Sequence, residues 1–343
     1  MVLVAQQMET HKYLIIQTAF LGDCILTLPL IQKIYELYNN SIIDVITTPQ
    51  GSEIFKLSPY LNNIFIFDKR NANKGFNNIL KFARDIRKNN YDTIISPHRS
   101  ARTALLSFFI HSKERISFDK SSLSFLYTNR VKYLKNIHEI QRNLKLIGLD
   151  ISKDELKKIH LNLNFSDLDT RKVDNILMNK NKTCAIAPGS VWKTKEYPIE
   201  YYYKIIDFLF KNEYIVYIIG SKSEKLLANK ILENFGSVID LTGQLTIRES
   251  IYFLSKVNLL IANDSAPTHM GSIVNTNVLT LYCSTIPEFG FFPFNEKGYY
   301  LSLDLDCKPC GIHGHQKCPK GHYNCAYQLN PEIVINKIRE IIR

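Results

Sequence analysis

Apolar stretches of strand length alternate with longer amphipathic stretches along most of this 343-residue chain, and the pattern runs twice. Parallel strands need a crossover connection, usually a helix, so the alternation predicts βα units and parallel sheets. The strands expected in the first run are 13–18, 42–47, 64–67 and 92–96. Those expected in the second run are 184–187, 214–219, 238–241, 257–262 and 278–282. Two such runs predict an α/β protein with two Rossmann-like domains, which bind ligands at the ends of their strands.

The amphipathic stretches predict the helices. They are 22–38, 73–89, 199–211, 223–234, 246–255, 267–274 and 331–341. The stretch 151–182 is polar and charged, which predicts the tail of one domain and a linker. The expected domains are therefore 11–170 and 180–330. The last helix, within 331–343, follows a cysteine-rich loop, and packing back on the N-terminal domain is an arrangement open to it.

The chain is basic, with 43 Lys and Arg residues against 32 Asp and Glu residues. The segment 69–145 alone holds 17 basic and 5 acidic residues. This surplus predicts an anionic partner, for which a phosphorylated or carboxylated substrate, an acidic membrane surface and nucleic acid are the candidates. No RRM, KH or helix-turn-helix signature accompanies the basic residues, so we expect no nucleic-acid partner.

The sequence predicts a cytoplasmic protein. No apolar run approaches the roughly 18 residues that span a bilayer, and the N-terminus lacks the basic start and long apolar core of a signal peptide. Residues up to about 11 predict a loose extension. The apolar stretch 104–110 and the mixed run 123–127 leave peripheral contact with a lipid surface open.

A polar turn follows the expected strand 257–262 and opens a helix. Asp264 or Ser265 can cap that helix, and Pro267 suits its first turn, where no amide hydrogen is needed. Free amides at such a helix start attract anions such as phosphate. His269 comes about one turn later, at the same end of the sheet. The sequence therefore predicts a ligand site at this turn.

A second polar loop follows the expected strand 184–187. Gly189 and Ser190 expose backbone amides directly after the strand, and Lys195 comes just before the next helix. Amides, a hydroxyl and a lysine suit a diphosphate, although a lysine-bearing surface loop has the same composition. Trp192, the only tryptophan, lies in this loop and suits contact with a ring or a sugar.

The first βα turn holds Gly22 and Asp23. Gly22 permits a tight backbone turn, and the Asp23 carboxylate at the helix start either caps the helix or accepts a proton from a substrate hydroxyl. No G-x-G-x-x-G is present, which argues against a nicotinamide cofactor. After the expected strand 92–96, Arg99 and Arg102 can each grip a phosphate or carboxylate with two hydrogen bonds.

Four cysteines lie within nineteen residues near the C-terminus: Cys307, Cys310, Cys318 and Cys325. Their spacing is not a paired C-x-x-C, so a structural metal and reduced thiols are both open. No other feature suggests metal-assisted hydrolysis, and we expect no catalytic metal.

These motifs, in this order and spacing, resemble the bacterial heptosyltransferases of glycosyltransferase family 9, most closely the lipopolysaccharide heptosyltransferase II type. The segments that carry the resemblance are Gly22-Asp23 with Pro29 downstream, His98-Arg99-Ser100, PGSVWKTKEYP from Pro188, NDSAPTH from Asn263 and CPKGHYNC from Cys318. The resemblance extends from Tyr13 to the final helix.

The resemblance implies a GT-B fold, with two Rossmann-like domains facing across a cleft, the acceptor domain first and the ADP-sugar donor domain second. It implies transfer of L-glycero-D-manno-heptose from ADP-heptose to the anionic inner core of lipopolysaccharide, with inversion and without a cofactor or metal. Asp23 matches the family's general base. The residues that match its donor site are Ser190, Lys195, Asp264, Ser265, Ala266 and His269.

We expect Gly22, Arg99 and Arg102 to bind the acceptor, with Arg115 and Arg142 as further candidates. Two alternatives keep the fold. One is a GT-B glycosyltransferase that acts on a capsule or a glycoprotein, and the other is a non-catalytic nucleotide-sugar binder, which would tolerate the loss of Asp23.

Overall fold

The structure, a computed structural model, describes residues 10–343 except 39, 70, 74 and 178–181. The chain divides into two compact units. Unit 1 holds residues up to 134 with 139–152 and 161–164, and unit 2 holds 135–138, 153–160 and 165–343. Residues 165–170, which we had expected in the N-terminal domain, thus belong to unit 2. Most of the expected N-terminal extension and the expected domain start at 180 lie outside the described residues.

Unit 1 is built on a six-stranded sheet in which all neighbouring strands are parallel. Its strands, in spatial order, are β3 (Asn63–Ile66), β2 (Ser41–Thr47), β1 (His11–Gln17), β4 (Thr93–Ser96), β5 (Glu114–Phe118) and β6 (Asn129–Val131). Its α-helices are α1 (Leu21–Ile25), α2 (Leu28–Leu37), α3 (Pro49–Phe55), α4 (Phe76–Arg87), α5 (Ala101–Ile110) and α6 (Glu139–Lys145). The sequence did not predict β5 and β6, because these short strands begin with charged or polar residues.

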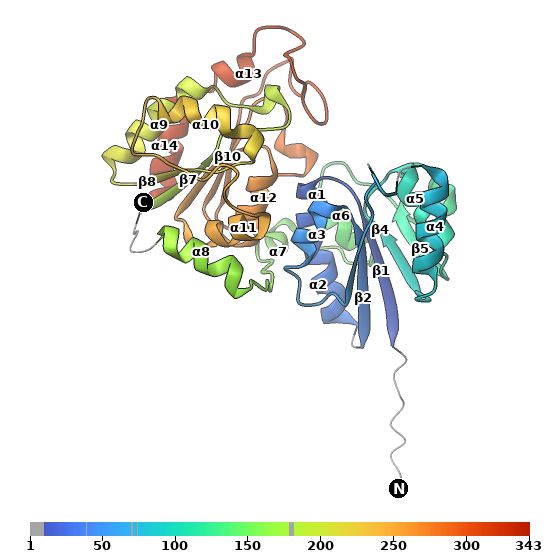
Figure 1. Cartoon of the computed structure of the whole chain (residues 1–343). Helices are drawn as coiled ribbons and strands as arrows, with labels where there is room; N and C mark the ends of the chain where they lie inside the picture. The colour runs from blue at the N-terminus through green and yellow to red at the C-terminus, as the bar shows by residue number, and fades with distance from the viewer. Residues whose placement is uncertain (1–9, 39, 70, 74, 178–181) are drawn as a thin grey trace. The chain divides into compact units, whose positions relative to one another are not determined.

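The two faces of the unit 1 sheet are covered by different helices. Side chains alternate along a strand, and Leu14 and Ile16 of β1 pack in one core with Ile79 of α4 and Leu106 of α5. Figure 1 shows α4 and α5 together on that side of the sheet. The apolar periodicity of the sequence therefore corresponds to a buried face on each of these elements.

The expected helix 22–38 is interrupted, and α1 and α2 take its place. Pro29 lies in the first turn of α2. In a continuous helix, proline would leave the carbonyl four residues earlier without its hydrogen bond, and its ring would clash with that carbonyl. The chain turns at Leu26 and Thr27 instead. The result is a short helix, α1, that carries Asp23 in its first turn next to the end of β1.

Unit 2 repeats the same architecture with a second parallel six-stranded sheet. Its strands, in spatial order, are β12 (Gly298–Ser302), β11 (Val278–Tyr282), β10 (Leu259–Asn263), β7 (Thr183–Ala187), β8 (Ile215–Ile218) and β9 (Ile239–Asp240). Its principal helices are α8 (Asp167–Leu177), α9 (Ile199–Lys211), α10 (Lys225–Leu232), α11 (Ile247–Lys256), α12 (Ala266–Ile273) and α14 (Pro331–Ile342). The expected linker 151–182 contains α8 and the short α7 (Lys153–Lys157). No helix in the described part of the chain has the length and apolar character that a membrane crossing requires.

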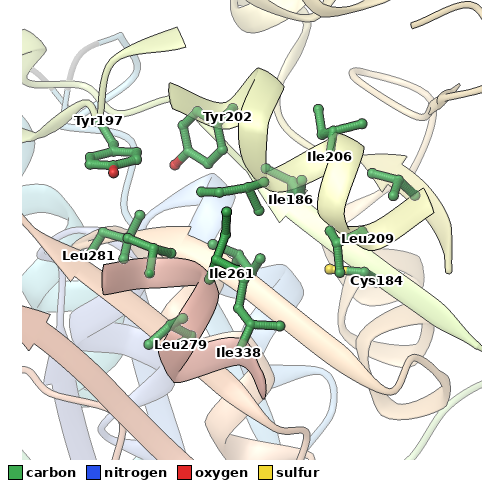
Figure 2. Close-up of a cluster of buried hydrophobic side chains, with 14 of the residues drawn as sticks. Cys184, Ile186, Tyr197, Tyr202, Ile206, Leu209, Ile261, Leu279, Leu281 and Ile338 are labelled. Carbon is green, nitrogen blue, oxygen red and sulfur yellow. The ribbon is translucent and has the colours of Figure 1, made fainter. Parts of the chain in front are cut away.

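Helix α14 buries its apolar face in the core of unit 2. Ile338 packs there with Ile186, Ile261 and Leu279 of the strands and with Leu209 of α9 (Figure 2). Asn330 caps the helix by accepting a hydrogen bond from the Glu332 backbone at 2.9 Å. The helix is thus part of the second unit.

Both sheets reverse their strand order at one point. From the first strand of each unit the chain steps outward to one edge, then returns to the other side of that strand, so the reversal lies between β1 and β4 in unit 1 and between β7 and β10 in unit 2. In open parallel sheets, ligands bind outside the carboxyl ends of the strands at such a reversal. The α/β class with two Rossmann-like sheets, expected from the sequence, is confirmed.

The packing of α14 generates a stability prediction. Ile338 is 0% exposed and Ile333, on the same helix, is 43% exposed. Ile338→Ala should lower the free energy of unfolding by about 2–5 kcal/mol, because it leaves a cavity in a packed core. Ile333→Ala should cost well under this amount. Urea unfolding followed by circular dichroism measures both, and equal losses would contradict the assignment of α14 to the core.

Candidate active site

The first βα turn of unit 1 is held by a chain of side-chain hydrogen bonds. The Ala19 amide donates to Gln17 Oε1 at 3.2 Å, and Gln17 Nε2 donates to Thr27 Oγ1 at 3.0 Å. Thr27 Oγ1 in turn donates to the Asp23 carbonyl at 2.8 Å. These bonds link the end of β1 to both ends of α1, so the backbone position of Asp23 is fixed.

Close packing holds α1 from two further sides. Asn143 of α6 is fully buried and donates from Nδ2 to the Leu26 carbonyl at 3.0 Å. On the other side, a Cβ at Gly51 of α3 would lie 2.2 Å from Thr47 Oγ1 and 2.9 Å from Cys24 Sγ. Only glycine allows α3 to approach this closely. The helix that carries Asp23 is thus built into a rigid part of the unit.

The environment of Asp23 favours its protonated form. Burial raises the pKa of Asp23 to about 7, and the negative charge of Glu139 acts in the same direction. Backbone hydrogen bonds and the charge of Arg99 lower it, but by less. A carboxylate that is half ionised near neutral pH can take up a proton there, which is what a general base requires.

Positive charges gather at the end of β4. His98 Nδ1 lies 3.0 Å from Thr18 Oγ1 and 3.1 Å from Thr103 Oγ1, and Lys69 donates to the Thr18 carbonyl at 2.7 Å. Burial, and after it the positive charges of Lys69, Arg99 and Arg102, lowers the pKa of His98 to about 4. Its imidazole is therefore neutral at pH 7. Sequence reasoning missed Lys69, since it lies 51 residues from Thr18 and belongs to no motif.

Arg99 lies over an aromatic ring. Its guanidinium carbon is 4.0 Å from the ring centroid of Tyr133, and that of Arg142 is 5.0 Å from the same centroid. Arg142 is 1% exposed and bonds Glu139 Oε2 at 2.6 Å from Nε. A side chain so deeply buried cannot reach an acceptor, which corrects that expectation for Arg142.

Arg115 is partly exposed, and its guanidinium is held by two backbone carbonyls. Its Nε donates to the Leu126 carbonyl at 3.2 Å, and its Nη1 donates to the Ser112 carbonyl at 2.8 Å. Both bonds use the guanidinium to tie two backbone segments together. Arg99 and Arg102 are exposed and follow β4, the neighbour of β1, and the charge of Arg99 acts on Asp23.

In unit 2, one buried asparagine connects two of the predicted motifs. Asn263, at the end of β10, donates to the Pro188 carbonyl at 2.6 Å. Its Oδ1 accepts from the Tyr197 amide at 3.2 Å and from the Tyr202 hydroxyl at 3.3 Å. The loop 188–198 is therefore fastened to β10, the neighbouring strand of β7.

This fastening places Lys195 against Asp264. Lys195, in the short 3-10 helix η2 (Lys193–Lys195), lies 2.6 Å from Asp264 Oδ2 and 3.2 Å from the Asp264 carbonyl. Thr285 Oγ1 donates to the same carboxylate oxygen at 2.6 Å. The two charged side chains are only 13% and 10% exposed. An ion pair at a strand end, with a lysine that can exchange partners, suits an anionic ligand.

The remaining predicted residues of unit 2 lie in the loop that follows β7 and in α12, which follows β10. The Ser190 amide donates to Glu196 at 3.2 Å, and Ser190 Oγ accepts from the Trp192 amide at 3.3 Å. Ser265 is the N-cap residue of α12, which begins at Ala266, but its side chain makes no capping hydrogen bond and instead donates to the Asn263 carbonyl at 3.3 Å. The expectation of a side-chain cap is therefore wrong.

His269 is the least satisfied polar group of the site. It is 5% exposed, and none of the described residues offers its Nδ1 a hydrogen-bond partner. Burial lowers the pKa of His269 to about 4; Asp264 raises it and Lys195 lowers it. At pH 7 the ring is therefore neutral. A buried nitrogen without a partner inside the protein is costly unless a ligand or water supplies one.

The cysteine-rich loop shows no ligand cluster. All seven cysteines are free, and in the part of the chain that the structure describes no three His, Cys, Asp or Glu side chains are grouped so that they could hold a metal ion.

A family model described as glycosyltransferase family 9 (heptosyltransferase) matches residues 79–323. The chain belongs to glycosyltransferase family 9. A curated relative, lipooligosaccharide heptosyltransferase 2 of Campylobacter jejuni, is 23% identical over 330 residues, which cover 94% of this chain and 96% of the relative.

Solved structures share the fold of this family 9 glycosyltransferase. The structure of ADP-heptose lipopolysaccharide heptosyltransferase II of E. coli superposes with a TM-score of 0.78 at 18% identity and covers 96% of this chain and 98% of its own. A family 9 glycosyltransferase of Veillonella parvula has a TM-score of 0.85 at 18% identity and covers 98% of both chains. At these identities the likeness concerns the fold.

The role of Asn263 can be tested by its removal. Asn263→Ala should destabilise the protein by about 2–6 kcal/mol, because it leaves a buried carbonyl and a buried amide without partners, at about 1–3 kcal/mol each. The partly exposed Asn277, which donates one bond to the Asn258 carbonyl, offers a matched control. Asn277→Ala should cost less than about 1.5 kcal/mol. Thermal unfolding of both variants measures the difference, and an unchanged melting temperature for Asn263→Ala would overturn the account.

Proposed function

We propose that this family 9 glycosyltransferase moves L-glycero-D-manno-heptose from ADP-heptose to the inner core of lipopolysaccharide, with inversion at the anomeric carbon. The observation that carries the proposal is the buried Lys195–Asp264 pair beside the unpartnered His269 Nδ1, at the strand reversal of unit 2. The names of its relatives, which are heptosyltransferases of lipooligosaccharide and lipopolysaccharide, support the sugar and the acceptor.

The donor side stabilises a leaving group. As the bond between the anomeric carbon and the phosphate oxygen breaks, its electron pair departs with ADP and negative charge grows on the diphosphate. Lys195 offers a fixed cation there, and Ser190 and the backbone amides at the start of α12 offer hydrogen bonds. His269, neutral at pH 7, can donate one ring N–H to a phosphate oxygen. We assign to these groups the charge stabilisation that a divalent cation gives in other transferases, and we therefore propose that transfer needs no metal.

The acceptor side supplies the base. Asp23 takes the proton of an acceptor hydroxyl while that oxygen attacks the anomeric carbon from the face opposite the departing phosphate, which inverts the configuration. Because the pKa of Asp23 lies at about 7, its carboxylate is ionised above neutral pH and is a stronger base than an ordinary aspartate. Arg99, Arg102 and Lys69 supply the positive charge that an anionic core oligosaccharide needs.

We also propose peripheral contact with the cytoplasmic face of the inner membrane, where a lipid-anchored acceptor would be found. Helix α4 carries Arg84 and Arg87 in its last turns, and Phe76 at its start is 53% exposed. Basic residues and exposed aromatic rings together favour an anionic lipid surface. The full chain should sediment with vesicles that contain anionic lipid at low salt and be released at high salt. Equal binding to neutral vesicles would argue against this surface.

Two variants should separate binding from chemistry. Asp23→Asn should lose at least about 100-fold in turnover, the lower range of general-base contributions, while its affinity for ADP is unchanged. His269→Phe keeps the ring volume but removes the hydrogen bond, and should weaken ADP binding by about 10- to 100-fold, as expected for a bond to a charged group. Calorimetry with ADP and a transfer assay with ADP-heptose and purified core oligosaccharide give both quantities.

The wild-type pH profile supplies an independent check. Protonation of Asp23 removes the base, so kcat/KM should fall as the pH drops through about 7. Near-normal turnover of Asp23→Asn, or a profile that is flat between pH 6 and 8, would refute the role of Asp23. Transfer that persists with excess chelator is expected, and its loss would refute metal independence.

A further inference from the structure

Trp192 and His313 form an aromatic pair that the proposed mechanism does not use. Their ring centroids are 6.3 Å apart and their planes are inclined by only 15°. Trp192 directly precedes η2, whereas His313 comes from the cysteine-rich loop, 121 positions later. Trp192 is partly buried and is the only tryptophan of the chain.

The backbone between the two segments is tightly joined, so the pair is held in place. The Thr194 amide donates to the His315 carbonyl at 3.0 Å, and the His315 amide donates to Thr194 Oγ1 at 2.8 Å. Between the two histidines, Gly314 has φ +83°, and a Cβ there would lie 3.3 Å from Lys195 Cγ and 3.0 Å from Thr194 Oγ1. A glycine is therefore needed for this loop to lie against Lys195.

The pair lies next to the proposed diphosphate site. The Lys195 amide donates to the Trp192 carbonyl at 2.9 Å. This bond closes a single backbone turn, which carries the indole of Trp192 at its start and the ammonium group of Lys195 at its end. His313 is within electrostatic reach of the same site, since the charges of Lys195 and Asp264 both act on it. In a nucleotide sugar, the transferred sugar is joined to the diphosphate by one oxygen atom, whereas the base is separated from it by the ribose. A ring beside Lys195 is therefore better placed for the sugar than for the base.

We propose that Trp192 and His313 form a platform for the donor's sugar ring, an inference that rests on the proposed function. The C–H face of a pyranose packs on an aromatic face, and the sugar hydroxyls remain free at the ring edge. As the bond to the phosphate breaks, the anomeric carbon gains positive charge. An indole face attracts positive charge, so the platform contributes to turnover as well as to binding.

The single tryptophan makes the platform directly observable. Its emission should change when the wild-type chain is titrated with ADP-heptose in the absence of acceptor, and should remain nearly constant with ADP alone. An equal change with both ligands would overturn the proposal, because it would place the nucleotide rather than the sugar on Trp192. No change with ADP-heptose, at concentrations where calorimetry shows binding, would also overturn it.

Variants test the contribution to turnover. Trp192→Ala should raise KM for ADP-heptose and lower kcat, each by at least threefold, and leave the affinity for ADP unchanged. Trp192→Phe retains an aromatic face and should restore most of the activity, and His313→Ala should show an intermediate loss. Val191→Ala changes the neighbouring side chain, which is 74% exposed, and should behave as wild type.

The outcomes distinguish this proposal from the proposed function. Wild-type transfer together with normal KM and kcat for Trp192→Ala would overturn the platform alone. A wild-type chain that neither binds ADP-heptose nor transfers heptose would overturn the proposed function and the platform with it. A melting temperature of Trp192→Ala that equals that of wild type establishes that a kinetic loss does not arise from unfolding.

Discussion

The parallel arrangement of both sheets is the constraint on which the rest of the structure depends. Because all strands of a sheet run in one direction, their carboxyl ends lie at one edge. The polar turns that follow the central strands therefore collect there, and the reversal of strand order separates the helices that would otherwise cover them. In unit 1 this edge presents Asp23 and Arg99, and in unit 2 it presents Lys195 and Asp264.

Buried polar groups then give each edge its chemical character. In unit 1, burial and Glu139 raise the pKa of Asp23 to about 7, while burial, followed by nearby positive charges, lowers the pKa of the neighbouring His98 and keeps it uncharged. In unit 2, Lys195 and Asp264 neutralise one another, and His269 has a buried nitrogen that the described residues leave without a partner. One unit thus offers a carboxylate with a raised pKa, and the other offers an ion pair beside a buried hydrogen-bonding group. These are complementary requirements of a glycosyl transfer from a nucleotide sugar.

Most of the central elements were predictable because their apolar periodicity is local. Strands β1, β2, β7, β10 and β11 and helices α9 and α11 lie close to the expected ranges. Strands β5, β6 and β12 were missed, since each is short and begins with exposed or half-exposed residues and so lacks a continuous apolar run. The break between α1 and α2 had a visible signal, Pro29, whose effect on the helix was underestimated.

By itself, the sequence determined the α/β class, the two-unit organisation and which turns carry reactive side chains, because each of these depends on neighbours within one strand–turn–helix segment. The tertiary structure decided which of those side chains meet. Lys195 and Asp264 are 69 positions apart, Lys69 and Thr18 are 51 apart, and Trp192 and His313 are 121 apart. It also buried Arg142, which removes that side chain from the acceptor candidates. Such pairings depend on strand order and loop packing, and neither can be deduced from the spacing of residues along the chain.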